Sequence, residues 1–215
     1  MSRRFRCDDE DDRAIGLRAA ASAVRRGALV VLPTDTVYGV GADAFCSDAV
    51  GELLAAKGRG RSMPVPVLVG APRTVDGLVA DFAGVGRDLA EAFWPGPLTL
   101  VCREQPSLSW DLGETRGTVA VRMPLHPVAI ELLTEVGPMA VSSANRSGSP
   151  PATTADEAEE QLGEAVAVYL DAGPSGDPVP SSIVDLTGDA PLLLREGAVG
   201  VEALREVAPD LAVAD

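Results

Sequence analysis

The amino-acid sequence predicts one α/β domain built on a mixed β-sheet. Short apolar runs typical of strands alternate with helical segments along the whole chain. The 215 residues are enough to bury a sizeable core. We find no internal repeat, low-complexity tract or linker, so we expect residues 1–215 to form a single domain with its motif-bearing core at about 11–200.

The first elements follow from apolar spacing and from residues that end helices. Apolar residues recur at helical spacing over residues 11–26, and Gly27 follows as a C-terminal stop. The continuous apolar run 28–32 predicts a strand. Ser47 is expected to cap a second helix that ends near Gly58.

The middle of the chain has the same alternation. Residues 65–69 predict a strand, and Pro66 within it favours a sheet edge or a bulge, because proline cannot donate to a ladder. Pro127 suits the first turn of a helix. The remaining elements expected here are helices near 74–82 and 87–93, a strand at 98–101, a polar loop at 103–117, a strand at 118–122 and a helix at 127–136.

The last third begins with a predicted strand at 139–141, followed by the polar segment "SSANRSG". Thr154 and Glu157 have the spacing of a capping box, which predicts a helix ending at Gly163. The other expected elements are strands at 166–170, 183–186 and 192–194 and a helix at about 201–207.

Composition excludes several classes of protein. The formal net charge of −14 argues against a protein that coats nucleic acid through a basic surface. No apolar run approaches a membrane span, and no apolar signal core follows the basic N-terminus. The three cysteines form no Cys-x-x-Cys pair, which disfavours a zinc site or a disulfide framework. We expect a cytoplasmic protein without a membrane anchor.

The familiar catalytic motifs are missing or misplaced. "GVGADA" at 39–44 matches a loose dinucleotide fingerprint, but its glycines lie too far beyond the preceding strand and the next helix starts late. There is no phosphate-binding Gly-x-x-x-x-Gly-Lys loop and no Gly-x-Ser-x-Gly elbow. The single histidine, His126, precedes Pro127 and is interpreted as a helix-entry residue rather than a general base.

Small polar residues and cations instead collect in the segments that follow strands. Lys57 is the only lysine in the chain, which indicates a position where a slim ammonium group is wanted. Strand-end loops of an α/β sheet tend to meet at one crevice. Lys57, Arg59, Arg122 and Arg195 would then meet there among many hydroxyls. Such a set suits a polyanionic phosphate ligand and chemistry by positioning and charge stabilisation.

Seven motifs follow one another between about Gly27 and Gly197, namely "PTDTVYGVGADA", "KGRGRSMP", "FWPGPLTL", "VAVRMPLHP", "SSANRSG", "PSSIVD" and "LREG". In this order they resemble the YrdC-type family of threonylcarbamoyl-AMP synthases. The resemblance implies a twisted sheet around a large cavity lined by positive charge. It also implies a nucleotidyltransferase that joins L-threonine, bicarbonate or CO2 and ATP, with Mg²⁺, to give threonylcarbamoyl-AMP and pyrophosphate.

The resemblance also implies roles for individual residues and for partners. A tRNA threonylcarbamoyl transferase would pass the product to the adenosine beside the anticodon, so contact with tRNA would be weak or indirect. No metal-ligating residue is implied. Lys57 and Arg59 would be catalytic and would bind the ATP phosphates with Ser142, Ser143, Asn145 and Arg195, while Thr34, Tyr38, Thr118, Arg122 and Ser182 would surround threonine, with Arg122 on its carboxylate.

Four positions depart from the family pattern, and one alternative function remains. Gly60, Met63 and Leu68 replace residues that are common in the family, and Ser182 stands where threonine is usual. The chain resembles the short form of the family, without a further C-terminal domain. The alternative is a YrdC-like module that binds RNA or a carbamoyl-adenylate and has no synthase activity.

Overall fold

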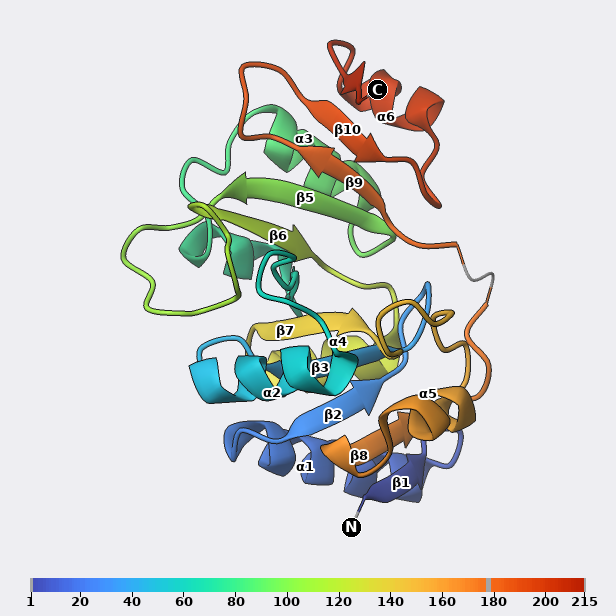
Figure 1. Cartoon of the computed structure of the whole chain (residues 1–215). Coiled ribbons are helices and arrows are strands. Elements are labelled where there is room, and N and C mark those ends of the chain that lie inside the picture. Colours follow the sequence, from blue (N-terminus) through green and yellow to red (C-terminus); the bar gives the residue numbers. More distant parts are fainter. Residues whose placement is uncertain (1, 177–178, 215) are drawn as a thin grey trace.

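The computed structural model describes residues 2–176 and 179–214, and all its strands join one sheet (Figure 1). The strand order is β1-β8-β2-β3-β7-β4-β6-β5-β9-β10-β11, with parallel and antiparallel neighbours mixed. Figure 1 shows this sheet twisting from the N-terminal end of the molecule to the C-terminal end. The predicted α/β fold with a mixed sheet and flanking helices is confirmed.

Three groups of elements make up the described chain. The strands from the N-terminal edge to the middle of the sheet are β1 (Arg3–Arg6), β8 (Val166–Asp171), β2 (Leu29–Leu32), β3 (Gly39–Asp43), β7 (Met139–Ser143) and β4 (Val67–Leu68). The remaining strands are β6 (Thr118–Arg122), β5 (Leu98–Arg103), β9 (Ser182–Asp185), β10 (Leu192–Arg195) and β11 (Ala212–Val213). The helices are α1 (Glu10–Arg25), α2 (Ser47–Lys57), α3 (Val85–Phe93), α4 (Pro127–Val136), α5 (Ala155–Leu162) and α6 (Val201–Val207), with short 3-10 helices at Pro72–Gly77 and Gly163–Ala165.

Helix ends follow the capping chemistry expected from the sequence, with one correction. The Thr154 hydroxyl accepts the backbone N–H of Glu157, and the Glu157 carboxylate accepts from Thr153. Gly58 ends α2 in the left-handed conformation. Ser47 does not cap α2, because Cys46 occupies the cap position and Ser47 is already the first helical residue.

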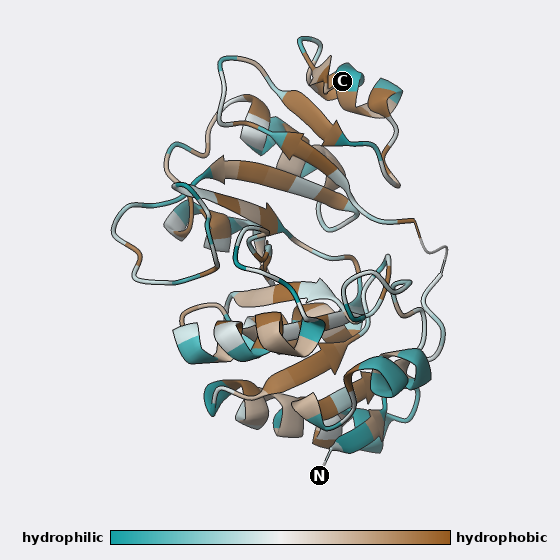
Figure 2. Ribbon diagram, viewed as in Figure 1, coloured by the Kyte–Doolittle hydropathy of each residue, from teal (hydrophilic) through white to brown (hydrophobic). Residues whose placement is uncertain are grey.

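The sheet is covered on both faces, so an inner strand such as β2 is apolar on both sides. In β2, Leu29 and Val31 belong to one buried cluster, whereas Val30 and Leu32 belong to the other. Helices α1 and α4 pack over one face, and α2, α3, α5 and α6 supply buried residues to the other. Figure 2 shows the apolar strands between helices whose outer faces are hydrophilic. None of the described helices is long and apolar enough to cross a membrane.

The sequence analysis missed three strands, namely β1, β3 and β11. The most consequential is β3, in which Val40 is the single strand-favouring residue and is flanked by Gly39 and Gly41. A Cβ atom on Gly39 would lie 2.7 Å from a methyl carbon of Val141, and one on Gly41 would lie 2.9 Å from the terminal carbon of Met139. These glycines admit the large side chains of β7, so they mark close strand packing rather than a dinucleotide loop.

The expectations for residues 65–69 and 74–82 were wrong in part. Strand β4 is not at an edge, because it lies between β7 and β6. Pro66 is tolerated because it precedes the strand, where its carbonyl accepts the backbone N–H of Val141 at 2.9 Å. The predicted helix at 74–82 is a 3-10 helix at Pro72–Gly77.

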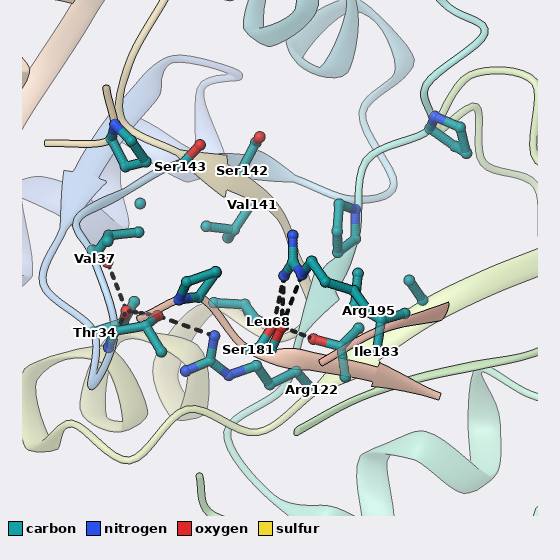
Figure 3. A pocket seen from close by; sticks show the side chains of 18 of the residues that line it. Thr34, Val37, Leu68, Arg122, Val141, Ser142, Ser143, Ser181, Ile183 and Arg195 are labelled. Atoms are coloured by element: carbon teal, nitrogen blue, oxygen red, sulfur yellow. Dashed lines mark hydrogen bonds between the residues drawn. The ribbon is translucent and has the colours of Figure 1, made fainter. Parts of the chain in front are cut away.

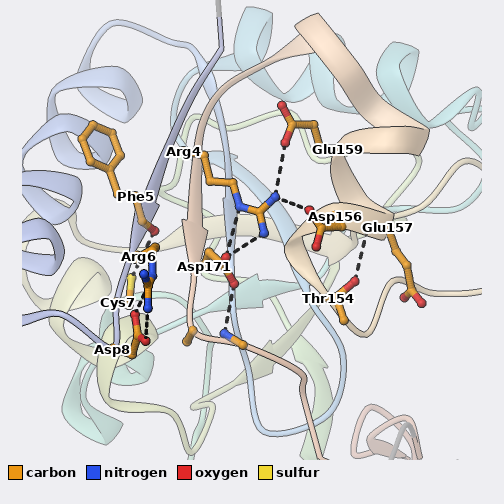
Figure 4. A network of polar contacts seen from close by, with 12 residues as sticks. Arg4, Phe5, Arg6, Cys7, Asp8, Thr154, Asp156, Glu157, Glu159 and Asp171 are labelled. Atoms are coloured by element: carbon orange, nitrogen blue, oxygen red, sulfur yellow. Dashed lines mark hydrogen bonds and ion pairs between the residues drawn. The ribbon is translucent and has the colours of Figure 1, made fainter.

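Strand β1 is attached to the rest of the domain through Arg4 (Figure 4). The Arg4 guanidinium donates to Asp171 on β8, with 2.7 Å between its nearest nitrogen and the carboxylate oxygen, and it also pairs with Asp156 of α5. Arg4 therefore joins an edge strand to its neighbour and to the helix above it. Because the group is partly exposed, we expect only a modest contribution to stability.

Candidate functional site

A cavity of about 540 Å³ opens where the β2–β3 loop, the segment after α2, and strands β7, β9 and β10 meet (Figure 3). One part of its wall is apolar, and another consists of hydroxyls and three arginines. The lining residues are Thr34, Thr36, Val37, Tyr38, Gly39, Arg59, Pro64, Pro66, Leu68, Thr99, Val101, Ala120, Arg122, Val141, Ser142, Ser143, Pro151, Pro180, Ser181, Ile183, Leu194 and Arg195.

The structure brings most of the predicted site residues to this cavity, but four of them do not line it. Those that line it are Thr34, Tyr38, Arg59, Arg122, Ser142, Ser143 and Arg195. Those outside the lining are Lys57, Thr118, Asn145 and Ser182. The family resemblance had implied that all eleven surround the substrates. It could not tell which of them face the cavity.

Arg122 is buried at the end of β6 and is held by three different acceptors. Its Nε donates to the carbonyl of Gly96, and its two terminal nitrogens donate to Thr36 and Asp35. The Asp35 carboxylate lies 2.7 Å away, and only 11% of its side chain is exposed. Burial lowers the pKa of Arg122, while Asp35 acts in the opposite direction. A guanidinium has five N–H groups, so with three used within the described residues two remain for a ligand.

Arg59 and Arg195 are held by uncharged acceptors instead. Arg59 donates to the Ser142 hydroxyl and to the carbonyl of Pro64. Arg195 donates through Nε and a terminal nitrogen to the carbonyl of Ser181, at 3.0 and 2.7 Å (Figure 3). Burial lowers the pKa of both arginines. No acidic residue is among the described residues that line the cavity, so these two charges are not neutralised there.

Lys57 is buried beside the cavity rather than in its wall. Its Nζ donates to the backbone carbonyls of Ser143 and Asn145 and approaches the Asn145 side-chain oxygen at 3.5 Å. Burial, followed by the charge of Arg59, lowers the pKa of Lys57 to about 8. All three ammonium protons have an acceptor within the described chain. The group therefore fixes the segment that follows β7.

Asn145 and Thr118 also point their polar atoms into the protein. The Asn145 amide nitrogen donates to the carbonyls of Arg146 and Ser149, which closes the turn after β7. The Thr118 hydroxyl donates to the carbonyl of Thr115 at 2.8 Å, at the outer end of β6. Neither residue lines the cavity in this conformation.

The loop from β2 to β3 supplies the polar wall next to Arg122. The Thr34 hydroxyl donates to the carbonyl of Val37 at 2.6 Å and lies 3.1 Å from the Thr36 hydroxyl. Tyr38 is fully buried, with its hydroxyl fixed between the carbonyl of Gly173 and the N–H of Ala172. Burial raises the pKa of Tyr38 to about 12, so it faces the cavity as an uncharged wall.

Ser181, rather than Ser182, faces the cavity. The Ser181 hydroxyl lies 2.9 Å from the Thr99 hydroxyl and accepts from Arg195. Sequence reasoning missed Ser181, Thr99 and Thr36 as lining residues. For Ser181, a signal was present in the two-residue period of a strand, because the apolar lining residue Ile183 requires Ser181 on the same side and Ser182 on the opposite side.

His126 is the residue before α4, as expected, and its side chain makes no capping hydrogen bond. Its Nδ1 is buried without a partner among the described residues, and burial lowers its pKa. It does not line the cavity. The structure therefore offers no histidine to act as a base there.

A magnesium ion would find no carboxylate in the described cavity wall. Nor does any cluster of three or more His, Cys, Asp or Glu residues suited to a metal occur within 2–176 and 179–214. Mg²⁺ is usually bound by one or two carboxylates together with substrate phosphates and water. The residues present do not form a resident magnesium site, so we treat Mg²⁺ as part of the MgATP substrate and derive no step through it.

Comparisons with known proteins agree with this architecture. A protein of Mycobacterium tuberculosis that is provisionally named a threonylcarbamoyl-AMP synthase is 59% identical over 207 residues, covering 96% of this chain and 95% of its own. The threonylcarbamoyl-AMP synthase of Bacillus subtilis is 38% identical over 190 residues, covering 87% of this chain and 55% of its own.

Solved structures show the same fold. The structure of P. abyssi Sua5 complexed with L-threonine superposes with a TM-score of 0.91 at 33% identity, covering 100% of this chain and 62% of that one. Escherichia coli YciO superposes with a TM-score of 0.82 at 25% identity, covering 95% of this chain and 100% of that one. A family model for Sua5, YciO and YrdC, described as telomere recombination, matches residues 22–197. The chain therefore belongs to the Sua5/YciO/YrdC family.

Proposed function

We propose that this protein is a threonylcarbamoyl-AMP synthase that uses ATP, L-threonine and bicarbonate or CO2. The observation that supports this most directly is which residues line the cavity. Arg59 and Arg195 present charges with no acid beside them, and Arg122 lies a short way off with its charge balanced by Asp35. A polyanion and a small monoanion therefore have separate places in one cavity. Relatives with the synthase name, one at 59% identity, support the same conclusion.

In this proposal the ATP phosphates bind to Arg59 and Arg195. The two N–H groups at one terminal nitrogen of Arg195 have no acceptor among the described residues, so they can reach phosphate oxygens. Ser142 and Ser143 line the same region. Lys57 and Asn145 act from behind the wall by holding the turn after β7.

Threonine would bind between Arg122 and the β2–β3 loop. The two remaining N–H groups of Arg122 can hold a carboxylate in two-point contact. Thr34 offers its hydroxyl, and the Tyr38 ring closes the pocket. We do not place Thr118 or Ser182 against threonine, because neither residue lines the cavity.

The chemistry then needs little from the protein beyond placement and charge. The neutral amine of threonine adds to CO2, a C–N bond forms, and one proton passes from the nitrogen to water, giving a carbamate. A carbamate oxygen attacks the α-phosphorus of ATP, a new P–O bond forms, and the bond to the β-phosphate oxygen breaks to release pyrophosphate. Charge builds on the phosphate oxygens during this step, and fixed arginines stabilise it without moving. No nucleophile–base pair is required.

The product is a reactive adenylate, so a second protein must accept it. We propose a tRNA threonylcarbamoyl transferase as that partner and the cytoplasm as the location. The net charge of −14 argues against a broad tRNA-binding surface on this chain. The same net charge disfavours the RNA-binding form of the alternative, and the experiment below tests a module that binds a carbamoyl-adenylate without catalysis.

The deciding experiment follows both products of ATP cleavage. We expect pyrophosphate and AMP-linked product to form only when ATP, threonine and bicarbonate are all present. Omitting either threonine or bicarbonate should stop the release, because neither alone makes the carbamate. Release of ADP and phosphate, or pyrophosphate formation that ignores threonine, would refute the synthase and favour the binding module.

A further inference from the structure

Ser182, the first residue of β9, has a hydroxyl that is completely occupied inside the protein. It donates to the carbonyl of Val199 at 2.6 Å and accepts the backbone N–H groups of Gly197 and Val199 at 2.9 and 3.1 Å. A serine hydroxyl has one donor and two acceptor positions, so its capacity is full. The side chain is wholly buried and does not line the cavity.

These bonds fasten the segment after β10 onto the start of β9. The N–H of Ala198 donates to the carbonyl of Pro180 at 3.0 Å, beside the Ser182 contacts. Gly197 permits this close approach, because a Cβ atom there would lie 2.2 Å from the Pro180 carbonyl oxygen. Two sequence segments, "PSSIVD" and "LREG", thus form one small clamp.

Arg195 lies at the beginning of the clamped segment. The pairing of β10 with β9 shifts between Leu193 and Arg195, so the sheet ladder alone does not set the direction of the Arg195 side chain. Its guanidinium is held instead by the carbonyl of Ser181, the residue next to Ser182. Figure 3 shows Arg195 and Ser181 joined in this way at the cavity wall.

We propose that Ser182 is a positioning residue for Arg195, and that it aims this guanidinium at the ATP phosphates without touching either substrate. The inference rests on the proposed function. It predicts that loss of the Ser182 hydroxyl weakens ATP binding through Arg195 and leaves threonine binding almost unchanged.

A double-mutant cycle tests this proposal. We would measure the dissociation constant of ATP by calorimetry, without threonine or bicarbonate, for the parent, Ser182→Ala, Arg195→Ala and the double variant. Loss of one buried hydrogen-bonded hydroxyl should weaken ATP binding about 3- to 10-fold in the parent background. In the Arg195→Ala background the same change should have less than about a 2-fold effect, because the residue it positions is gone.

Controls separate positioning from general damage to the fold. Ser182→Thr keeps a hydroxyl and should restore ATP affinity to within about 2-fold of the parent. Tyr169→Phe removes another buried hydroxyl that donates to a backbone carbonyl, at Gly163, and it lies outside the cavity wall. It should leave ATP affinity unchanged. If Ser182→Ala does not fold, Ser182→Cys, which replaces the hydroxyl with a weaker donor, takes its place in the cycle.

Two outcomes would overturn the positioning role. One is an equal loss of ATP affinity in the parent and Arg195→Ala backgrounds. The other is a rise of the threonine KM in Ser182→Ala with no change in ATP affinity, which would place Ser182 against threonine. Failure of the parent protein to bind ATP would instead reject the proposed function, and the cycle distinguishes this case because it includes the parent.

Discussion

Arg122 and Arg195 lie in one cavity wall but are built into it in opposite ways. Arg122 is anchored by the carboxylate of Asp35, whereas Arg195 is anchored by a backbone carbonyl and a hydroxyl of Ser181. Arg59 resembles Arg195, with Ser142 and a carbonyl as its acceptors. An acid beside an arginine cancels its charge at a distance, while neutral acceptors leave it intact. In the proposed function, this difference divides the cavity into a region for the single carboxylate of threonine and a region for the several phosphates of ATP.

The largest effect should come from breaking the Arg122–Asp35 pair. Arg122→Ala leaves the buried Asp35 carboxylate with only the N–H of Leu125 as a donor, and one of its oxygens already lacks a partner among the described residues. Removing one member of a buried pair costs about 3–5 kcal/mol of unfolding free energy. Urea titration should show this loss, and the double variant with Asp35→Asn should recover part of it. Equal stability of Arg122→Ala and the double variant would show that the unpaired Asp35 carboxylate does not destabilise the fold.

The second effect concerns the arginines with neutral anchors. Arg59→Ala and Arg195→Ala leave no carboxylate unpaired, so we expect the fold to persist. Each removes hydrogen bonds from a cation to phosphate, and kcat/KM for ATP should fall about 100-fold. Pyrophosphate release at varied ATP measures this change. If both variants keep the parent's kcat/KM for ATP, Arg59 and Arg195 do not bind the phosphates.

A smaller and more selective effect is expected for Arg122→Lys. Lysine keeps a charge near Asp35 but loses the planar fork that can hold a carboxylate at two points. The KM for threonine should rise about 10-fold, while the KM for ATP should change by less than about 3-fold. The same pyrophosphate assay gives the KM for threonine when threonine is varied at saturating ATP, and the KM for ATP when ATP is varied at saturating threonine. A larger change in the KM for ATP than in the KM for threonine would show that Arg122 belongs to the phosphate region and not to the carboxylate region.

The sequence predicted this division only in part, and particular residues explain the difference. The α/β fold was predicted from the alternation of strand and helix patterns. Strand β3 was missed because its close packing against Val141 and Met139 requires Gly39 and Gly41, and glycines in a sequence usually indicate a loop. The segments that form the cavity were identified because small polar residues follow strands. The sequence did not show which side chains in these segments point into the cavity. A hydroxyl or ammonium group has the same place in the sequence whether it binds a ligand or a backbone carbonyl.

Asp35 illustrates the limit most clearly. It stands between Thr34 and Thr36 in the printed sequence, and nothing local indicates a partner 87 positions away in Arg122. The balance of charge at Arg122 depends on how the β2–β3 loop folds back over β6. That information resides in the tertiary structure and not in the spacing of the motif.

The last prediction concerns Lys57, the cation that touches neither region directly. Its pKa in the folded chain is lowered from 10.5 to about 8, chiefly by burial. Below pH 8 both the folded and unfolded chains hold this proton, so the cost of burying the charge is present in full. Between pH 8 and 10.5 the unfolded chain keeps the proton that the folded chain has lost, and the cost is relieved as the pH rises. The contribution of Lys57 to the unfolding free energy should therefore rise across this window, by no more than about 1.4 kcal/mol per pH unit.

We would measure urea unfolding between pH 7 and about pH 10 for the parent and for Lys57→Met, which has no titrating group at this position. The variant should be less stable at every pH, because the carbonyls of Ser143 and Asn145 lose their donor, but the difference between the two chains should widen above pH 8. A constant difference would mean that the Lys57 ammonium has an ordinary pKa and reaches solvent or a ligand, which would return it to the phosphate region.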